Sequence, residues 1–212
     1  MVRIILIRHG ETTWNLEGRY QGQVNTPLSP RGIEQGRKAA AALRTIPLDA
    51  CIASPLSRAQ DTCRFAADLH GLPVLTDERL TEISHGAWEG RYAADIEAQY
   101  PDAFHLWHTH PERVQMPGGE NLEDVRRRAR AAFDDIARRY DGKTVLVCAH
   151  DAVNKAILCD LLGLGIDHFW QIKQDNACIN VVECTDGVWR IVLLNSTIHL
   201  GFLVSGIEQK GL

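Results

Sequence analysis

The 212-residue sequence lacks any apolar segment near the roughly 20 residues of a membrane-spanning helix, and its start has no small-residue cleavage site. It has only six cysteines, none in a Cys-x-x-Cys pair, and Cys51 and Cys148 stand within apolar runs as small hydrophobic residues do. The net charge of −4 gives no overall electrostatic footprint for nucleic acid. We therefore expect a cytoplasmic protein with reduced cysteines, and neither a membrane nor a nucleic acid as a partner.

The sequence also lacks internal repeats and low-complexity linkers, and its 45% hydrophobic content suffices to fill one core, so residues 1–212 are expected to form a single domain. Apolar runs that read as buried strands alternate with helical patterns, and a Thr-Asp-Gly turn joins two late strands as a hairpin. The expected strands are 2–7, 48–53, 144–149, 179–184 and 189–194, and the expected helices are 30–43, 56–69 and 152–162. This order predicts an α/β fold with a mostly parallel sheet flanked by helices, and a helical cap at about 87–140.

Polar residues of one chemical kind follow three of the expected strands. Arg8 and His9 end the first, Arg58 follows the second, and His150 follows the third. Because functional crevices of open α/β sheets lie at the carboxyl ends of strands, these side chains should meet. Two arginines suit a bound phosphoryl group, and cationic neighbours keep an imidazole neutral and nucleophilic. Glu82 could protonate the departing alkoxide and then activate water.

Four segments of the chain resemble, in order, the motifs of the histidine phosphatase superfamily, also called phosphoglycerate mutase-like. They read RHGETTWN, ASPLSRAQDT, LTEISHGAWEG and VLVCAHDA. The resemblance implies a three-layer sandwich and a phosphohistidine formed on His9. It also implies that Arg8, Arg58 and His150 bind the phosphoryl group, with Glu82 as general acid and then base.

Other site residues follow from the same resemblance. Asn15 and Gln21 match positions that reach the phosphate or the substrate, and His85, three residues after Glu82, is expected to face the pocket. Asp151 stands where the family usually has glycine. We expect it to cap the following helix and to turn its carboxylate onto backbone N–H groups. A carboxylate pointing into the pocket would instead favour substrates with a cationic group such as an amine.

Two further clusters invite other interpretations. His105, His108 and His110 could suggest a metal site, but no carboxylate or cysteine stands at ligand spacing beside them. A phosphohistidine mechanism needs no metal, so we expect no metal and no cofactor. The basic run at 126–130 is expected to form a solvated helix face.

The reaction is expected to be hydrolysis rather than phosphate transfer between substrate positions. Mutases of the family carry Glu-Arg-His-Tyr-Gly in the third motif and an Arg-Arg pair in a longer insertion, whereas this chain has Glu-Ile-Ser-His-Gly and no such pair in residues 87–125. EISHGAW, FWQIKQDNACINVV and NSTIHLG resemble the metal-independent phosphoserine phosphatases. L-phosphoserine is therefore the favoured substrate.

Several alternatives stay open. The sequence supports an α-ribazole phosphatase, or a broad-specificity sugar-phosphate or phosphoglycerate phosphatase, nearly as well as a phosphoserine phosphatase. It gives less support to a cofactor-dependent phosphoglycerate mutase or to a regulator that acts on phosphorylated proteins. The Trp- and His-rich segment 87–118 suggests a lid over a small phosphorylated metabolite. A homodimer is an expectation from the family alone.

Overall fold

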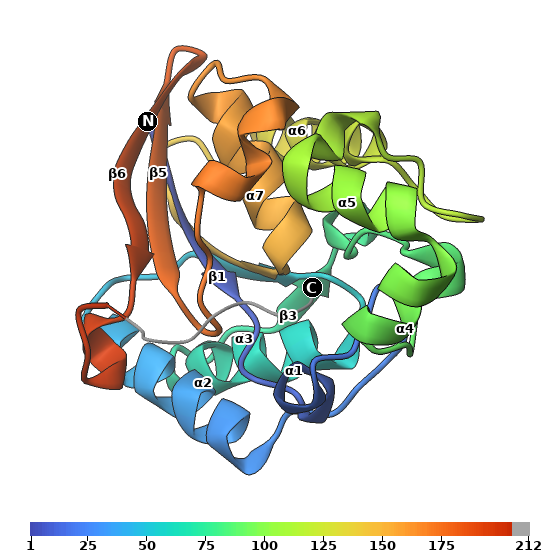
Figure 1. The fold of residues 1–212 in the computed structure, drawn as a ribbon. Coiled ribbons are helices and arrows are strands. Elements are labelled where there is room, and N and C mark those ends of the chain that lie inside the picture. Colours follow the sequence, from blue (N-terminus) through green and yellow to red (C-terminus); the bar gives the residue numbers. More distant parts are fainter. Residues whose placement is uncertain (205–212) are drawn as a thin grey trace.

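A mixed sheet of six strands forms the centre of the computed structural model, which describes residues 1–204 (Figure 1). The strand order is β3-β2-β4-β1-β5-β6. Their bounds are β1 Val2–Arg8, β2 Ala50–Ala53, β3 Val74–Thr76, β4 Thr144–Ala149, β5 Ile179–Thr185 and β6 Val188–Ser196. β3, β2, β4 and β1 are parallel, while β5 and β6 add an antiparallel hairpin at one edge. The predicted α/β class with a mostly parallel sheet is confirmed.

Strand β1 shows why the sheet needs cover on both faces. Its side chains alternate between two cores, Ile4 and Leu6 on one face and Ile5 and Ile7 on the other. All four are buried, as the continuous apolar run predicts for a strand in the middle of a covered sheet.

Helices cover both faces of the sheet (Figure 1). α2 and α3 supply the core on the face of Ile5, and α6 and α7 supply the core on the other face. The helices span α1 Thr13–Glu17, α2 Pro30–Leu43, α3 Ser57–Leu69, α4 Ala93–Gln99, α5 Pro101–Thr109, α6 Leu122–Arg139 and α7 Asp151–Leu161. Ser29 caps α2 by accepting from the Gly32 amide, with Pro30 at the first helical position, as the sequence predicts.

The elements differ from the expected ones mainly at short segments. β3 is a three-residue strand at the edge of the sheet, partly exposed, and its length gives no alternating pattern to detect. The segment expected as a helical cap holds α4, α5 and α6. The predicted hairpin of β5 and β6 is confirmed.

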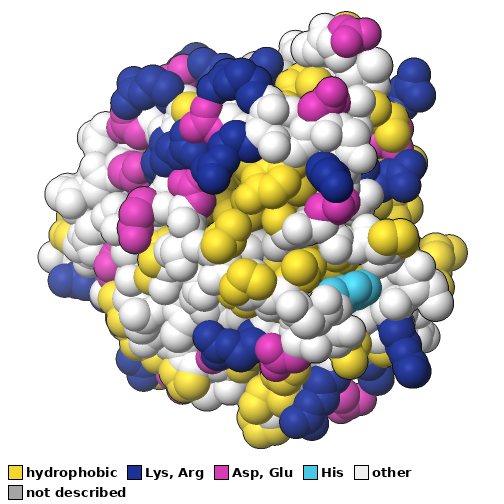
Figure 2. All heavy atoms as spheres, turned by 180° about the vertical axis from the view of Figure 1, so that it is seen from behind, with side chains coloured by type: hydrophobic (Ala, Val, Ile, Leu, Met, Phe, Trp, Pro, Cys, Tyr) yellow, Lys and Arg dark blue, Asp and Glu magenta, His cyan; other side chains and the backbone are white. Residues whose placement is uncertain are grey.

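All six cysteines are buried and free, as predicted for Cys51 and Cys148 from the apolar runs around them. No helix within residues 1–204 combines the length and the apolar character that a bilayer crossing requires. Figure 2 shows basic and acidic side chains interspersed over the far face of the molecule. Ion pairs such as Arg126–Glu123 and Arg138–Asp135 on α6 join neighbouring charges of opposite sign.

Candidate active site

The ends of two neighbouring strands bring two histidines together. β1 and β4 pair with Arg8 opposite Ala149, and the His9 amide donates to the Ala149 carbonyl at 3.0 Å. His9 and His150 therefore leave the sheet side by side, with their ring centroids 5.2 Å apart. Arg58 joins them from the first turn of α3, which follows β2. Arg8, His9, Arg58 and His150 are all buried, and we call them the basic cluster.

The hydrogen bonds of His9 determine which ring nitrogen can react. Nδ1 lies 2.7 Å from the Gly10 carbonyl oxygen, and because a carbonyl only accepts, Nδ1 carries the proton. Nε2 is then the nitrogen with the lone pair, and the Arg58 Nε–H donates to it at 3.3 Å. Burial, followed by the charges of Arg58 and Arg8, lowers the pKa of His9 well below its usual value. His9 is thus a neutral imidazole with Nε2 free of a proton.

The two arginines are fixed by backbone carbonyls. Arg58 donates from Nη1 to the Val24 oxygen at 2.8 Å and from Nη2 to the Gly22 oxygen at 2.7 Å. Burial lowers the pKa of Arg58 to about 10, so the guanidinium stays charged at neutral pH. Arg8 donates from Nη1 to the Gln174 oxygen at 2.6 Å. Two oriented guanidinium groups beside a neutral imidazole form a site for a phosphoryl group.

His150 precedes α7 as its N-cap residue. Its Nε2 lies 2.7 Å from the Ser54 hydroxyl, and burial, followed by the charge of Arg58, lowers the pKa of His150 well below its usual value. When the Ser54 hydroxyl donates to Nε2, the proton of the neutral ring is on Nδ1. Nδ1 has no hydrogen-bond partner among residues 1–204, so this N–H is available to an anion.

Glu82 supplies a carboxyl group close to the basic cluster. Its Oε1 accepts from the Ile83 amide at 2.9 Å and its Oε2 from the Ala152 amide at 3.4 Å. Burial, followed by the nearby charge of Asp151, raises the pKa of Glu82. A buried carboxyl with a raised pKa suits a group that donates a proton and later takes one back.

The prediction of a solvated face for the basic run of α6 is wrong for Arg128. Its guanidinium lies half-buried and donates to the backbone oxygens of Arg79, Thr81 and Glu82. It also pairs with the Glu120 carboxylate, 2.9 Å from Nε. Arg128 thus holds the segment that carries Glu82, because three carbonyls that lack partners within a regular element need a donor.

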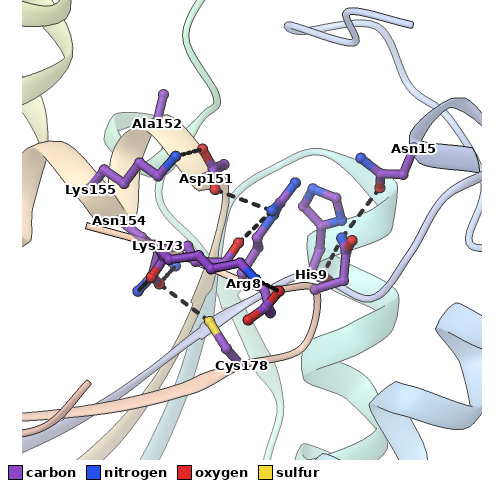
Figure 3. Close-up of polar contacts among 12 residues, drawn as sticks. Arg8, His9, Asn15, Asp151, Ala152, Asn154, Lys155, Lys173 and Cys178 are labelled. Carbon is purple, nitrogen blue, oxygen red and sulfur yellow. Dashed lines mark hydrogen bonds and ion pairs between the residues drawn. The ribbon is translucent and has the colours of Figure 1, made fainter. Parts of the chain in front are cut away.

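Asn15 and Gln21 both use their amide oxygens within the protein. The Gln21 Oε1 accepts from the Thr12 hydroxyl at 2.8 Å and the Thr26 hydroxyl at 2.5 Å. The Asn15 Oδ1 accepts from the Thr12 amide at 3.0 Å and from Asn176 Nδ2 at 3.3 Å. The N–H groups are therefore the part of each amide suited to meet an anion, and Figure 3 shows the Asn15 side chain close to His9. Contact with a substrate stays a prediction for both.

His85 lies among aromatic rings. Its ring is T-shaped to Tyr20 at 5.0 Å and to Trp107 at 5.8 Å, and stacks on Trp88 at 6.4 Å. Neither ring nitrogen has a hydrogen-bond partner within the described part of the chain. Burial lowers the pKa of His85 to about 3, so the ring is neutral. We call Tyr20, His85, Trp88 and Trp107 the aromatic wall.

The histidines that could suggest a metal site, His105, His108 and His110, lie on α5 and in the turn after it. All three are exposed, and His108 also stacks on Trp170 at 5.4 Å. In the chain up to residue 204, no three His, Cys, Asp or Glu side chains lie grouped to hold a metal ion.

The expectation that Asp151 caps α7 is wrong. The N-cap residue is His150, and Asp151 occupies the first helical position. Its carboxylate is drawn to two cations instead, with Oδ1 3.1 Å from Arg8 Nη1 and Oδ2 2.8 Å from Lys155 Nζ. Figure 3 shows these three charged side chains in a row that leads to the side of His9. Both oxygens face cations of the protein, which weakens the case for a substrate amine bound there.

Sequence reasoning missed several residues that support the site. Ser54 contacts His150, Asn176 contacts the His9 carbonyl at 3.3 Å, and Lys155 pairs with Asp151. Lys155 carried a signal, since a lysine four residues after an aspartate lies on the same helix face and can pair with it. Arg128 carried a weaker one, because it stands three residues after Val125, beside the apolar stripe of α6. Asn176 lies in a loop and carried none.

Comparisons with known proteins agree with this geometry. The model of the histidine phosphatase superfamily (branch 1) matches residues 4–197. Phosphoserine phosphatase 1 of Hydrogenobacter thermophilus is 36% identical over 201 residues, covering 95% of this chain and 95% of its own. The adenosylcobalamin/alpha-ribazole phosphatase of Escherichia coli is 28% identical over 195 residues, covering 92% of this chain and 96% of its own.

A solved structure shows the same fold. Bacillus stearothermophilus YhfR superposes with a TM-score of 0.91 at 30% sequence identity, covering 94% of this chain and 100% of that one. The sheet and helices that position the basic cluster are therefore those of a known architecture.

Proposed function

Since the chain belongs to the histidine phosphatase superfamily and is a phosphoric monoester hydrolase, we propose that it transfers a phosphoryl group from a small phosphorylated metabolite to His9 and then to water. The observation that carries this proposal is the hydrogen-bond pattern of His9. Nδ1–H donates to the Gly10 oxygen, so Nε2 presents a lone pair beside the guanidinium of Arg58.

In the first step, His9 Nε2 attacks phosphorus and the bond between phosphorus and the ester oxygen breaks. Arg8, Arg58 and His150 offset the charge on the phosphoryl oxygens. Glu82 gives its proton to the departing oxygen, so the alcohol leaves neutral. The products of this step are the alcohol, phosphohistidine and the Glu82 carboxylate.

In the second step, the Glu82 carboxylate takes a proton from water as the water oxygen attacks phosphorus. The bond between phosphorus and Nε2 breaks, inorganic phosphate leaves, and His9 and Glu82 return to their starting states. The protein itself supplies the positive charge and the acid–base group for both steps. We therefore propose that the reaction requires no metal or other cofactor.

L-phosphoserine is the substrate that we propose. The phosphoserine phosphatase relative is more similar to this chain than the alpha-ribazole phosphatase relative is, at 36% against 28% identity. His85, close to Glu82 in sequence and with both ring nitrogens unpartnered among residues 1–204, is a group that a small polar substrate could hydrogen-bond. The second candidate is an α-ribazole phosphatase, which the E. coli relative supports.

The test is phosphate release from a panel with and without EDTA, for the wild-type protein and His9→Ala. The panel comprises L-phosphoserine, phosphothreonine, 3-phosphoglycerate, α-ribazole phosphate, p-nitrophenyl phosphate and a phosphorylated peptide. We expect EDTA-resistant hydrolysis that is highest on L-phosphoserine and absent in His9→Ala. Similar low rates on several esters would contradict the phosphoserine assignment alone.

A trapping experiment tests the intermediate separately. Rapid acid-free denaturation after mixing with labelled substrate should leave label on the protein that survives alkali and is lost in acid, as expected of phosphohistidine. Glu82→Gln should retain the label longer, because the base for the second step is missing. Label that resists acid, or label that persists in His9→Ala, would contradict His9 as the nucleophile.

A further inference from the structure

The first residue of α7 places a carboxylate directly behind the basic cluster. Asp151 follows His150 and is fully buried. A carboxylate beside a phosphate site repels the anion that the site binds. The Asp151 carboxylate therefore weakens phosphate binding unless another group offsets its charge and its contacts help to position the phosphate ligands.

The charge is offset by Lys155, one helical turn further on. Asp151 Oδ2 lies 2.8 Å from Lys155 Nζ, and both side chains are at most 1% exposed. The Lys155 ammonium lies 4.4 Å from the ring centroid of Trp170 and 5.0 Å from that of Phe169, which stabilises a buried cation. The two residues thus form a neutral ion pair that adds no net charge to the site.

The other oxygen of Asp151 contacts a residue of the basic cluster. Oδ1 lies 3.1 Å from Arg8 Nη1, and the same nitrogen donates to the Gln174 oxygen at 2.6 Å. Figure 3 shows the Arg8 guanidinium between Asp151 and the His9 ring. One edge of the guanidinium is therefore anchored on the side away from the reacting nitrogen.

We propose that Asp151 and Lys155 are positioning residues, whose ion pair orients the Arg8 guanidinium toward the phosphoryl group without changing the net charge of the pocket. This inference rests on the proposed function, because that function makes Arg8 a phosphate ligand. In that function, neither Asp151 nor Lys155 contacts the phosphorus or the attacking His9 nitrogen. Their effect passes through Arg8 by pre-organisation of its charge.

Asp151 has a second effect, on Glu82. The groups that act on the Glu82 carboxyl come from its own segment and from three helices. The Ile83 amide lies next to it, Asp151, Lys155 and the Ala152 amide come from α7, Arg58 comes from α3, and Arg128 of α6 acts through the Glu82 backbone oxygen. The charge of Asp151 raises the pKa of Glu82 and that of Arg58 lowers it. Loss of the Asp151 charge alone should therefore lower this pKa, and the rate should begin to fall at a lower pH.

Two double variants separate contact from charge. Asp151→Leu with Lys155→Met replaces the pair by apolar residues of similar size, which removes one anion and one cation and leaves the net charge of the pocket unchanged while Arg8 loses the carboxylate. Asp151→Asn with Lys155→Met is equally neutral but keeps an oxygen for Arg8. The matched control is Asp160→Asn on the same helix, where the carboxylate pairs with Arg126 and Arg130 away from the site.

The measurements are kcat/KM against pH with L-phosphoserine or the best substrate of the panel, and the Kd of orthovanadate by calorimetry. We expect the Leu-containing double to lose about 10- to 100-fold in kcat/KM and a similar factor in vanadate affinity. The Asn-containing double should recover most of both losses. The alkaline limb should stay near its wild-type position in both doubles, because each removes the Asp151 anion together with the Lys155 cation and the two act on Glu82 in opposite directions. Asp160→Asn should keep the wild-type rates and profile.

Three results would decide against the inference or the function beneath it. A Leu-containing double within about twofold of wild type in both measurements would overturn the positioning role. Equal losses in the two doubles would also overturn it, because the oxygen facing Arg8 would then not matter. A wild-type protein that hydrolyses no phosphomonoester would refute the proposed function, and the vanadate affinities, which need no turnover, would still test the pair.

Discussion

The basic cluster and the aromatic wall are both closed off from solvent, yet different forces hold them. Arg8, Arg58 and His9 are fixed by hydrogen bonds to backbone carbonyls. His85 in the wall is held by ring contacts, and its two nitrogens have no partner in the chain up to residue 204. The first region is pre-organised for one charged group that every phosphomonoester carries. The second leaves polar atoms for the part of the substrate that differs between esters, so chemistry and selectivity should respond to different substitutions.

Glu82→Gln should have the largest effect and should depend on the leaving group. The serine alkoxide needs a proton to depart, whereas p-nitrophenolate does not, so we expect the rate of phosphoryl transfer to His9 to fall about 10²- to 10⁴-fold with phosphoserine and much less with p-nitrophenyl phosphate. The second step, in which Glu82 is the base, should slow equally for both. Presteady-state rates with both substrates check this. Equal losses in the first step on the two substrates would contradict a role as general acid.

The pH profile tests the same assignment. Glu82 must be protonated in the first step, and its raised pKa places the fall in rate on the alkaline side, above the usual range of a carboxyl. His9 must be neutral, and its lowered pKa places the acidic limb well below the usual range of histidine. Glu82→Gln should remove the alkaline limb and leave the acidic one. An alkaline limb that persists unchanged would assign it to another group.

Arg58→Lys should come next, with a loss that does not depend on the leaving group. Lysine keeps the charge but loses the fork that bonds Gly22 and Val24 and faces His9 Nε2. We expect kcat/KM to fall about 100-fold for both phosphoserine and p-nitrophenyl phosphate. Arg64→Lys, an exposed position on the same helix, is the matched control and should behave as wild type. A loss confined to one substrate would break the separation between the two regions.

Arg128→Met should give a smaller loss that passes through Glu82. The carbonyls of Arg79 and Thr81 would lose the Arg128 donor, and that of Glu82 would keep only Gln23 Nε2 at 3.0 Å. We expect the free energy of unfolding to fall by about 1–3 kcal/mol and kcat with phosphoserine to fall about tenfold. Denaturant titration and steady-state kinetics measure the two effects. The exposed neighbour Arg127→Met is the control, and equal behaviour of the two variants would show that the Glu82 segment does not depend on α6.

Sequence reasoning reached the basic cluster because strand ends and local motifs determine it. Arg8, His9 and His150 follow continuous apolar runs, and parallel strands place such residues at one edge. The surroundings could not be predicted in the same way. The carboxylate of Asp151 was expected on backbone amides, yet it pairs with Arg8 and Lys155, because two buried cations attract it more strongly than a helix terminus.

The other misses have the same origin. Arg128 reaches across from α6 to a loop some 46 residues away in sequence, and Asn176 reaches His9 from a loop near the end of the chain. Such contacts depend on how elements pack rather than on local pattern. The single-domain organisation, the homodimer and the cytoplasmic location stay predictions.

His85→Phe should have the smallest effect and the most selective one. Phenylalanine preserves the ring contacts with Tyr20 and Trp107 but removes both nitrogens. One hydrogen bond to the substrate contributes about 1 kcal/mol, so we expect KM for phosphoserine to rise about fivefold with little change in kcat. p-Nitrophenyl phosphate, whose aryl group offers no matching polar atoms near the ester, should keep its KM.

The pH dependence of the KM difference between His85→Phe and wild type shows whether His85 recognises the substrate as a neutral ring or as a cation. The pKa of His85 is lowered to about 3, so the imidazole is neutral over the working range. The ratio of phosphoserine KM values between His85→Phe and wild type should therefore stay constant across that range. A ratio that grows as the pH falls through 6.5, the ordinary value for histidine, would mean that the substrate draws a proton onto His85. The aromatic wall would then act as a second cationic region, and the division of labour between it and the basic cluster would fail.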